Sequence, residues 1–418
     1  MTLDNYYILE KVVNTFCNCS KTQTLDSEYR LDPATGLWTL IVEGRDARPS
    51  NTERNDVESA LYESEKRRDP CCPFCLGNES LTPETVAKAA LKLSASKKNE
   101  RDVDDFEIVS PTSDGEFDKS DWFVRVFENK YPFFRMNAAG EDVPTFKTVE
   151  KELTSGESKS TALFNSISGR GRHEVIVDSR RHVRSWSEFS ELETKLTFRV
   201  FRSRLRALRD SGCFAYSFVF KNVGSGAGAS QRHSHCQLTG NIELPPDVGR
   251  EIERLIQYER ARKARGENAS FWDALLDAEL QAQARVVAVT ERFVVYCPYA
   301  SRFPVQTEIC PRFDGSFEDY DEVALDELAL LVRKTIAALE NAKRRHYSDD
   351  PKPLDYNVVM KNVPSLLTSG LCEGVGLARP RWLILPSLVK KAGYEIGCGV
   401  DINPISPETA ARLLRETF

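Results

Sequence analysis

The hydrophobic pattern along the chain alternates between short extended runs and longer stretches with helical periodicity. Apolar–polar alternation or continuous apolar runs of strand length predict six strands, which lie near 122–127, 173–177, 214–221, 292–297, 305–310 and 382–386. Helical periodicity predicts four helices, which lie near 83–97, 187–209, 246–264 and 318–345. Two short extended runs flank a turn at 32–36, and the second of them is 37–42. Strands and helices are therefore expected along most of the chain.

The second half of the sequence repeats the pattern of the first. The octapeptide at 216–223 returns at 356–363 with five identities, and each copy follows strands and a long helix and precedes a loop and another strand. This order predicts a duplicated unit. We expect an N-terminal extension over 1–25, a first half over 26–240 and a degenerate second half over 241–418. Where the first copy has His233 and His235, the second has Arg379 and Arg381, which are expected to be surface arginines, the alternative being contact with a phosphate across an interface.

Composition restricts the class of protein. The 418 residues are 41% hydrophobic and carry a net charge of −6, which is typical of a globular protein and gives no electrostatic reason to expect nucleic acid or an anionic membrane as the main partner. No apolar run approaches the roughly 18–20 residues of a membrane helix, and the first 20 residues lack the pattern of a secretory signal. The chain is therefore expected to be cytoplasmic. Its eleven cysteines are then more plausible as reduced thiols or metal ligands than as a disulfide framework.

One strand near the middle of the chain carries candidate chemistry. Alternation along this strand places His233, His235 and Gln237 on one face, directly after a glycine-rich loop at 224–230. Glycines at 224, 226 and 228 would let backbone N–H groups approach a phosphate closely. An imidazole beside such a loop can attack an α-phosphorus, and Gln237 can donate to a non-bridging oxygen. The alternative is a pair of surface histidines after a flexible loop.

A Cys-x-x-Cys pair, Cys72 and Cys75, has the spacing of a zinc knuckle. Zinc needs two further ligands, and the sequence contains no second Cys-x-x-Cys but five histidines. A redox pair or two buried thiols is the alternative.

Taken together, these motifs resemble the galactose-1-phosphate uridylyltransferase family, including its ADP-glucose phosphorylase branch, within the histidine-triad (HIT) superfamily. The similarity runs from Arg30 to the C-terminus, and residues 1–25 and 78–120 lie outside it. The matching segments are 30–38, 45–49, 72–78, 124–132, 173–182, 220–237, 393–397 and 402–404.

The resemblance implies a fold and a set of roles. The fold would be α+β, a duplicated HIT-like unit with antiparallel sheets and packed helices, and the protein would be a homodimer. His235 would be the nucleophile, Gln237 would contact the transferred phosphoryl group, and His182 and His233 would complete a mainly structural zinc site with Cys72 and Cys75. The substrate-binding candidates are Arg45, Arg48, Gly228 and Ser230 for phosphate, Asn129 and Asn222 for the nucleotide, and Tyr394 and Glu395 for the sugar.

The leading hypothesis is therefore a nucleotidyltransferase of the UDP-glucose–hexose-1-phosphate uridylyltransferase type with a covalent nucleotidyl-histidine. Its partners would be a nucleotide sugar and a sugar-1-phosphate or phosphate. ADP-glucose phosphorolysis is the near alternative, and a non-catalytic nucleotide-sugar binding protein is the alternative from another class. One zinc per chain is expected, because Arg312 and Phe313 stand where some family members have histidines. No role is expected for His173, beyond local hydrogen bonds, or for His346.

Overall fold

A computed structural model describes most of the chain. The described residues are 27–42, 69–92, 101–110, 122–136, 146–148, 165–167, 169–267, 269–346, 352–368 and 378–418. The predicted extension over 1–25 lies outside them, as do Arg45 and Arg48.

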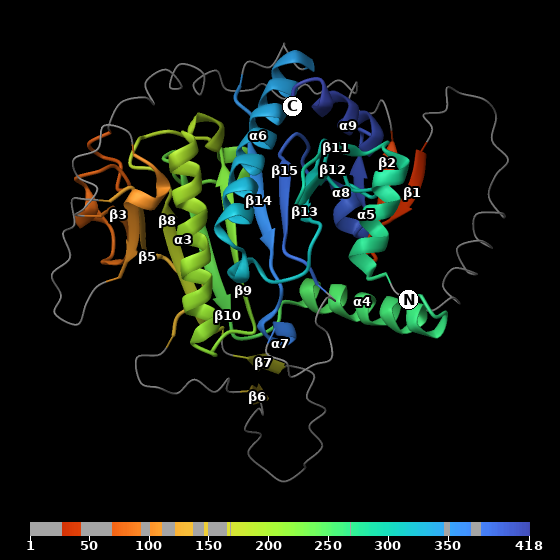
Figure 1. Cartoon of the computed structure of the whole chain (residues 1–418), viewed down its shortest axis with the longest axis horizontal. Coiled ribbons are helices and arrows are strands. Elements are labelled where there is room, and N and C mark those ends of the chain that lie inside the picture. The colour runs from red at the N-terminus through yellow and green to blue at the C-terminus, as the bar shows by residue number, and fades with distance from the viewer. Residues whose placement is uncertain are drawn as a thin grey trace, which may run out of the picture.

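One large antiparallel sheet organises the molecule (Figure 1). Its strands in chain order are β3 (Thr85–Leu91), β4 (Phe106–Val109), β5 (Val124–Glu128), β8 (Gly171–Val177), β9 (Tyr216–Val223), β10 (His235–Asn241), β11 (Val286–Val289), β12 (Phe293–Tyr296), β13 (Thr307–Pro311), β14 (Tyr356–Lys361) and β15 (Arg381–Pro386). Within the described ranges these eleven strands lie in the order β11-β12-β13-β15-β14-β9-β10-β8-β5-β3-β4. The strands of the two predicted halves therefore meet at the antiparallel pair β9–β14.

Helices cover both faces of this sheet. They are α3 (Glu191–Asp210), α4 (Pro246–Ala264), α5 (Phe271–Ala282), α6 (Glu322–His346), α7 (Ser365–Thr368), α8 (Gly393–Cys398) and α9 (Pro407–Arg415), with short 3₁₀ turns at Glu79–Leu81, Val103–Asp105, Trp186–Glu188, Ser225–Ala227 and Phe317–Asp319. The long helices α3 and α6 pack side by side over the middle of the sheet (Figure 1). Helix α3 starts at a capping box in which Ser190 accepts from the Glu193 N–H and the Glu193 carboxylate accepts from the Ser190 N–H.

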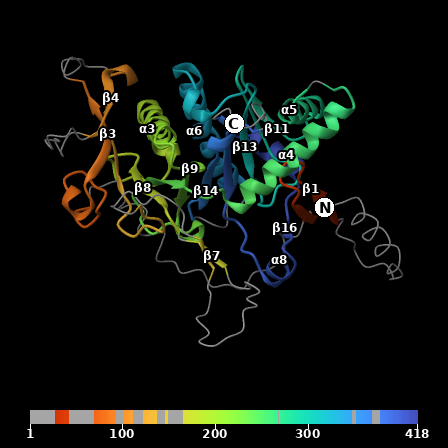
Figure 2. The same cartoon turned by 90° about the horizontal axis from the view of Figure 1, so that it is seen from below.

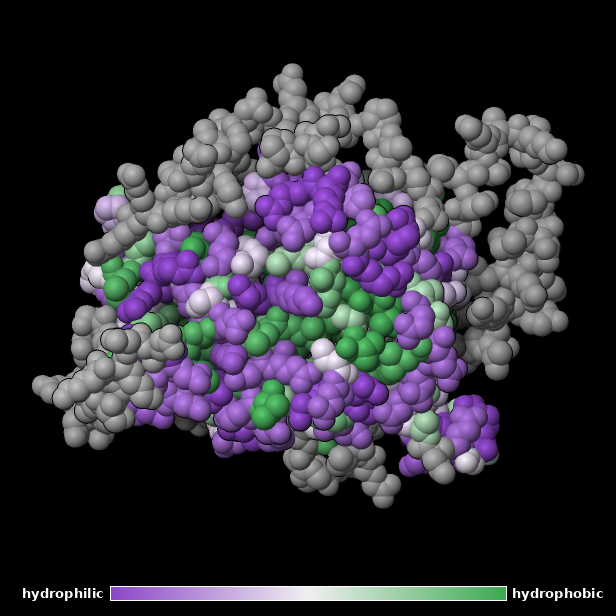
Figure 3. All heavy atoms as spheres, turned by 45° about the horizontal axis from the view of Figure 1, so that its top comes forward, coloured by the Kyte–Doolittle hydropathy of each residue, from purple (hydrophilic) through white to green (hydrophobic). Residues whose placement is uncertain are grey.

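Alternation along the strands separates two cores. On one face, Val219, Val358 and Ile384 pack with residues of α3 and α6 in the main hydrophobic cluster. On the opposite face, Val294 and Cys310 pack with residues of α4 and α5 in a second cluster. Hydrophilic residues dominate the surface seen in Figure 3, as expected where amphipathic helices turn their apolar sides toward a sheet. The mixed architecture confirms the α+β class and the antiparallel sheet with packed helices.

Two small sheets complete the described structure. Strands β6 (Phe146–Thr148) and β7 (Asn165–Ile167) form a hairpin. Strand β2 (Trp38–Val42) pairs with β1 (Ser27–Leu31) on one side and, in parallel, with β16 (Asp401–Asn403) on the other. We call the sheet β1–β2–β16 together with α8 the terminal module, because it joins segments from both ends of the chain. Figure 2 shows α8 and β16 projecting from the second half, on the opposite side of the molecule from β3 and β4.

One sequence prediction about local structure was wrong. The segment predicted as a helix near 83–97 contains strand β3, which pairs with β4 and β5. Its alanines favour a helix in isolation, but pairing on both edges and burial of Ala87 and Ala89 outweigh that propensity.

The matching residues of the two octapeptides, 216–223 and 356–363, do not occupy equivalent positions in the sheet. Lys221 is paired with Val358 and faces α3 and α6, whereas Lys361 points to the opposite face and contacts Glu251 of α4. Equal letters in the two copies therefore lie on opposite sides of the sheet, because a one-residue shift inverts a strand's faces. The order of elements supports a duplication better than the octapeptide does, and the boundary at 240/241 stays a prediction.

In the described part of the chain, none of the helices has both the length and the apolarity required to cross a bilayer.

Candidate functional site

Strand β10 presents the candidate nucleophile. It lies between β8 and β9, and its pairing fixes which side chains share a face. Cys236 and Leu238 enter the main core under the helices, so His235 and Gln237 lie on the opposite face, as alternation predicts. His235 is only 6% exposed and its ring lies 5.1 Å from the ring of Phe74.

The orientation of the His235 ring is set by its own strand. Its Nδ1 lies 2.9 Å from the carbonyl oxygen of His233, and a carbonyl accepts hydrogen bonds only. Nδ1 therefore carries the proton, and Nε2 keeps its lone pair. Burial, with a further contribution from Lys221, lowers the pKa of His235 and favours the neutral imidazole. A neutral, oriented imidazole is the form required of a nucleophile.

A buried ion pair supports this strand from behind. The Nζ group of Lys221 donates to Asp178 (2.8 Å), to the Ser234 hydroxyl (2.7 Å) and to the His235 carbonyl (3.1 Å). Three contacts use all three protons of the ammonium group, so Lys221 ties β9 to β10 at the reactive residue. Sequence reasoning missed this pair, since a lysine in an apolar run gives no sign of its partner.

Gln237 takes part in a second hydrogen-bonded group. Its Oε1 lies 2.8 Å from Nε2 of His173 on β8 and 3.5 Å from Nδ2 of Asn129, which follows β5. Asn129, a predicted nucleotide contact, is thus brought beside Gln237. His173, to which the sequence assigned no role, is 3% exposed and contacts the candidate phosphoryl-binding residue.

The four predicted zinc ligands lie together. The ligand atoms of Cys72, Cys75, His182 and His233 all lie within 4.8 Å of one another, and within the described ranges this is the only such cluster found. Nδ1 of His233 is 3.6 Å and 3.5 Å from the two sulfurs, and Nδ1 of His182 is 3.3 Å from Cys75. The other nitrogen of His233, Nε2, donates to the Ser179 carbonyl at 2.8 Å.

This arrangement fits a metal ion. The Ser179 bond leaves the Nδ1 lone pair of His233 directed at the cluster, which is how metal-binding histidines are usually held. Burial lowers the pKa of His233 to about 4, which keeps the ring neutral, as a ligand must be. Two thiols and two imidazoles are a donor set typical of structural zinc.

The glycine loop differs from its prediction. The N–H of Gly226 donates to Asp355 (2.7 Å), and the N–H groups at 227, 228 and 229 donate to carbonyls of the loop itself. Gly224 has a φ of +83°, and a Cβ there would lie 1.8 Å from Asp355, which is also paired with Arg184. The glycines allow close packing against the second half. These four N–H groups therefore do not form the open phosphate cradle that the composition suggested.

The remaining substrate-binding candidates fall in two places. Asn222 accepts from Asn357 Nδ2 at 2.8 Å and lies on the same face as Gln237, while Gly228 and Ser230 are exposed in the loop after β9. Tyr394 and Glu395 belong to α8 in the terminal module, where Tyr394 contacts the Tyr29 hydroxyl at 2.7 Å. The structure therefore brings Asn129 and Asn222 to the face of the sheet that carries His235, and it places Tyr394 and Glu395 in the module.

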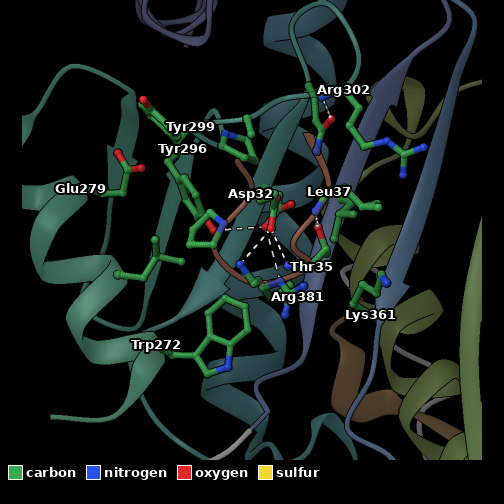
Figure 4. Close-up of a pocket in the computed structure, with 18 of the residues that line it drawn as sticks. Asp32, Thr35, Leu37, Trp272, Glu279, Tyr296, Tyr299, Arg302, Lys361 and Arg381 are labelled. Carbon is green, nitrogen blue, oxygen red and sulfur yellow. Dashed lines mark hydrogen bonds and ion pairs between the residues drawn. The ribbon is translucent and has the colours of Figure 1, made fainter. Parts of the chain in front are cut away.

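The second half has a charged pocket on the same face of the sheet (Figure 4). Arg381 of β15 lies there between Glu251 (2.9 Å), Glu308 (3.4 Å) and the ring of Trp272 (4.1 Å). The prediction that Arg379 and Arg381 are surface arginines was wrong, because they are 2% and 3% exposed. Acidic partners from α4, α5 and β13 balance their charges inside the protein.

The described structure thus combines an antiparallel sheet, an oriented histidine on β10 and a buried Cys₂His₂ cluster beside it. Residues 92–245 match the family model described as galactose-1-phosphate uridyl transferase, N-terminal domain. The chain is 26% identical over 393 residues to ADP-glucose phosphorylase of Arabidopsis thaliana, covering 93% of this chain and 92% of the relative. It is 23% identical over 407 residues to galactose-1-phosphate uridylyltransferase of Thermotoga maritima, covering 93% and 98%.

Solved structures agree with the fold. The crystal structure of an ADP-glucose phosphorylase from Arabidopsis thaliana with bound ADP-glucose superposes with a TM-score of 0.67 at 22% identity, covering 94% of this chain and 99% of that one. The chain is thus similar over almost its whole length to nucleotidyltransferases of the galactose-1-phosphate uridylyltransferase family, and residues 92–245 match the N-terminal domain model of that family.

Proposed function

We propose that this protein transfers a nucleotidyl group from a nucleoside diphosphate sugar through a covalent intermediate on His235. The observation that carries the proposal is the hydrogen bond from Nδ1 of His235 to the His233 carbonyl, which leaves Nε2 as the nucleophile. Double displacement follows from the chemistry of a nitrogen nucleophile, because a phosphoramidate forms readily and is cleaved readily by a second acceptor.

In the first step Nε2 of His235 attacks the α-phosphorus. A nitrogen–phosphorus bond forms, the bond between the α-phosphorus and the bridging oxygen breaks, and the sugar-1-phosphate leaves with that oxygen's electron pair. The proton on Nδ1 stays on the ring, so the nucleotidylated imidazole is cationic and its charge is stabilised by the His233 carbonyl. Gln237 would donate to a non-bridging oxygen as negative charge develops there. In the second step an acceptor oxygen attacks the same phosphorus and His235 leaves.

Cys72, Cys75, His182 and His233 would hold a structural zinc ion, about one per chain. Through these four residues a zinc ion would link the knuckle to His233, two positions before the proposed nucleophile. Phe74, inside the knuckle, packs against both His233 and His235. The knuckle therefore positions the nucleophile through packing as well as through the metal site.

Phosphorolysis of ADP-glucose is the specific activity we favour within this class. It is supported by similarity over 93% of the chain to an ADP-glucose phosphorylase. Residues 393–404 also resemble that branch. Transfer from UDP-glucose to galactose-1-phosphate is the second candidate, supported by similarity of equal coverage to a uridylyltransferase.

We also propose that the enzyme works as a homodimer. Tyr394 is 46% exposed and Ile396 is 75% exposed in α8, which projects from the second half (Figure 2). Strand β2 of the same module ends three residues before Arg45. A second copy that received this module would add the predicted sugar contacts Tyr394 and Glu395 to the site around His235. A purely monomeric species in sedimentation at working concentrations would contradict this.

The test is transfer of radiolabel from the α-phosphate of ADP-glucose or UDP-glucose to the protein. Acid-labile label should appear on the wild type and be absent from His235→Asn. Release of label by phosphate indicates a phosphorylase, and release by galactose-1-phosphate indicates a uridylyltransferase. Tight nucleotide binding without label or turnover would contradict the proposal and favour a non-catalytic binding protein.

A further inference from the structure

A buried histidine next to the proposed site has a specific hydrogen-bonding direction. His173 lies on β8 directly opposite Thr239 of β10, and its side chain reaches diagonally to Gln237. Nε2 of His173 and Oε1 of Gln237 are 2.8 Å apart. What this contact does depends on which nitrogen of the imidazole carries the proton.

The backbone decides the tautomer. The amide N–H of Phe133 points at Nδ1 of His173 at 3.3 Å, and a backbone amide nitrogen can only donate. Nδ1 is therefore the acceptor, so a neutral ring carries its proton on Nε2. Burial lowers the pKa of His173, which keeps the ring neutral. The ring is also held by stacking on Phe133, with centroids 3.9 Å apart. Nε2–H then donates to Oε1 of Gln237.

Asn129 fixes the same oxygen independently. Its Oδ1 accepts from the N–H of Tyr131 at 2.8 Å, so its amino group is the end that faces Gln237. That Nδ2 lies 3.5 Å from Oε1 of Gln237. It is also 3.1 Å from Nε2 of His173, a contact between two donors that is not a hydrogen bond in this tautomer. Two donors therefore converge on one atom of Gln237, and that atom must be the carbonyl oxygen.

The consequence is a fixed polarity for the Gln237 amide. With Oε1 held by His173 and Asn129, the amino group Nε2 is the free end, and among the described residues it has no acceptor. Gln237 shares its face of β10 with His235, two residues earlier. Without these donors the amide could rotate by 180° at little cost, and a carbonyl oxygen would then face the phosphoryl group.

We propose that His173 is a positioning residue that holds Gln237 so that its N–H groups point at the phosphoryl group transferred to His235. The inference rests on the proposed nucleotidyl transfer. His173 would not touch the substrate and would act only through Gln237.

The test is the single-turnover rate of His235 nucleotidylation in two His173 variants. His173→Phe keeps the ring stacked on Phe133 but removes the donor, and it should slow labelling about 10- to 100-fold. His173→Gln can still donate to Oε1, and it should recover most of the rate. The dissociation constant for the nucleotide sugar, the zinc content and the melting temperature should stay close to those of the wild type.

Two further variants separate positioning from a structural role. Thr239→Val is the matched control, because Thr239 lies opposite His173 and its hydroxyl has no hydrogen-bond partner among the described residues. It should label at the wild-type rate. His173→Phe combined with Gln237→Ala should be no slower than Gln237→Ala alone, because His173 acts through that residue.

Each outcome decides between explanations. The inference would be overturned if His173→Phe were labelled as fast as the wild type. It would also be overturned if the double variant were slower than Gln237→Ala by the factor that His173→Phe alone produces. Either result would leave the proposed function intact. If the wild type takes no label from either nucleotide sugar, the proposed function fails. The hydrogen-bond chain can still be read by ¹⁵N NMR of His173. A proton on Nε2 is expected there, and a proton on Nδ1 would overturn the inference.

Discussion

The two halves of the large sheet carry different chemistry on the same face. In the first half, β8 and β10 present neutral side chains, His173, His235 and Gln237, whose orientations are set by hydrogen bonds. In the second half, β15 presents Arg381, which is paired with Glu251 of α4 and Glu308 of β13 and lies over the ring of Trp272 of α5.

The surroundings of His235 and of Arg381 meet different physical requirements. A nucleophile needs an uncharged lone pair, and the hydrogen bond from Nδ1 of His235 to the His233 carbonyl leaves that lone pair on Nε2. A buried guanidinium needs full compensation instead, which Glu251 and Glu308 supply to Arg381. Related strand arrangements therefore hold the proposed reactive site in one half and a charge network in the other.

The largest effect is expected from removing the nucleophile. His235→Asn should lower nucleotidylation by at least about 10³-fold, because the Nδ1 lone pairs of His173 and His233 are already directed at the Phe133 N–H and at the two cysteine sulfurs. Label transfer measures this, with His346→Asn at the end of α6 as the matched control. Substantial residual labelling of His235→Asn would mean that the chemistry lies elsewhere.

Metal removal comes next. Cys75→Ser, or treatment with a strong chelator, should reduce zinc from about one per chain to near zero and destabilise the first half by several kcal/mol. Elemental analysis and thermal unfolding check both. The exposed neighbour Cys71 offers the control Cys71→Ser, which should change neither quantity. Metal-free wild type with normal stability would exclude a structural role.

Lys221→Met tests the buried ion pair behind β10. The change leaves Asp178 buried without its cation and should cost about 3–5 kcal/mol in the free energy of unfolding. Labelling by the folded fraction should also fall, because the contact to the His235 carbonyl is lost. Urea unfolding together with single-turnover labelling measures the two effects, and a loss of stability alone would show that the pair does not position the nucleophile.

Arg381→Met is the counterpart in the second half. It should cost a similar amount, about 3–5 kcal/mol, because Glu251 and Glu308 lose their partner. Labelling by the folded fraction should be unchanged. The exposed Arg250 provides the control Arg250→Met, for which a change below about 0.5 kcal/mol is expected. Impaired labelling in Arg381→Met would show that the two regions are coupled.

The smallest expected effect is a pH dependence. Burial alone would raise the pKa of Glu251, but Arg381 and Lys361 hold it below its ordinary value. A lowered pKa in the folded state stabilises the protein above the unfolded value of about 4.3 and loses that contribution as the pH falls through the folded value. The stability difference between wild type and Glu251→Gln should therefore shrink below about pH 4, which urea titrations at several pH values would show. A constant difference would contradict the assignment.

The sequence anticipated the elements with strong periodicity. Helix α4 begins and ends where predicted, at Pro246 and Ala264, and α3 and α6 begin within four residues of their predicted starts. The segment containing β3 was misassigned because its alanines carry helix propensity, and only pairing with β4 and β5 makes it a strand.

For the site, the sequence by itself determined the local chemistry. Alternation placed His235 and Gln237 on one face, and the Cys-x-x-Cys spacing indicated two candidate metal ligands, because each pattern spans only a few residues. Tertiary structure alone decided which neighbours complete these groups. His173 meets Gln237, Lys221 meets Asp178, and Asp355 takes the N–H of Gly226, which composition had assigned to phosphate. Such contacts join residues dozens of positions apart, and their hydrogen-bond direction depends on three-dimensional geometry that no local pattern records.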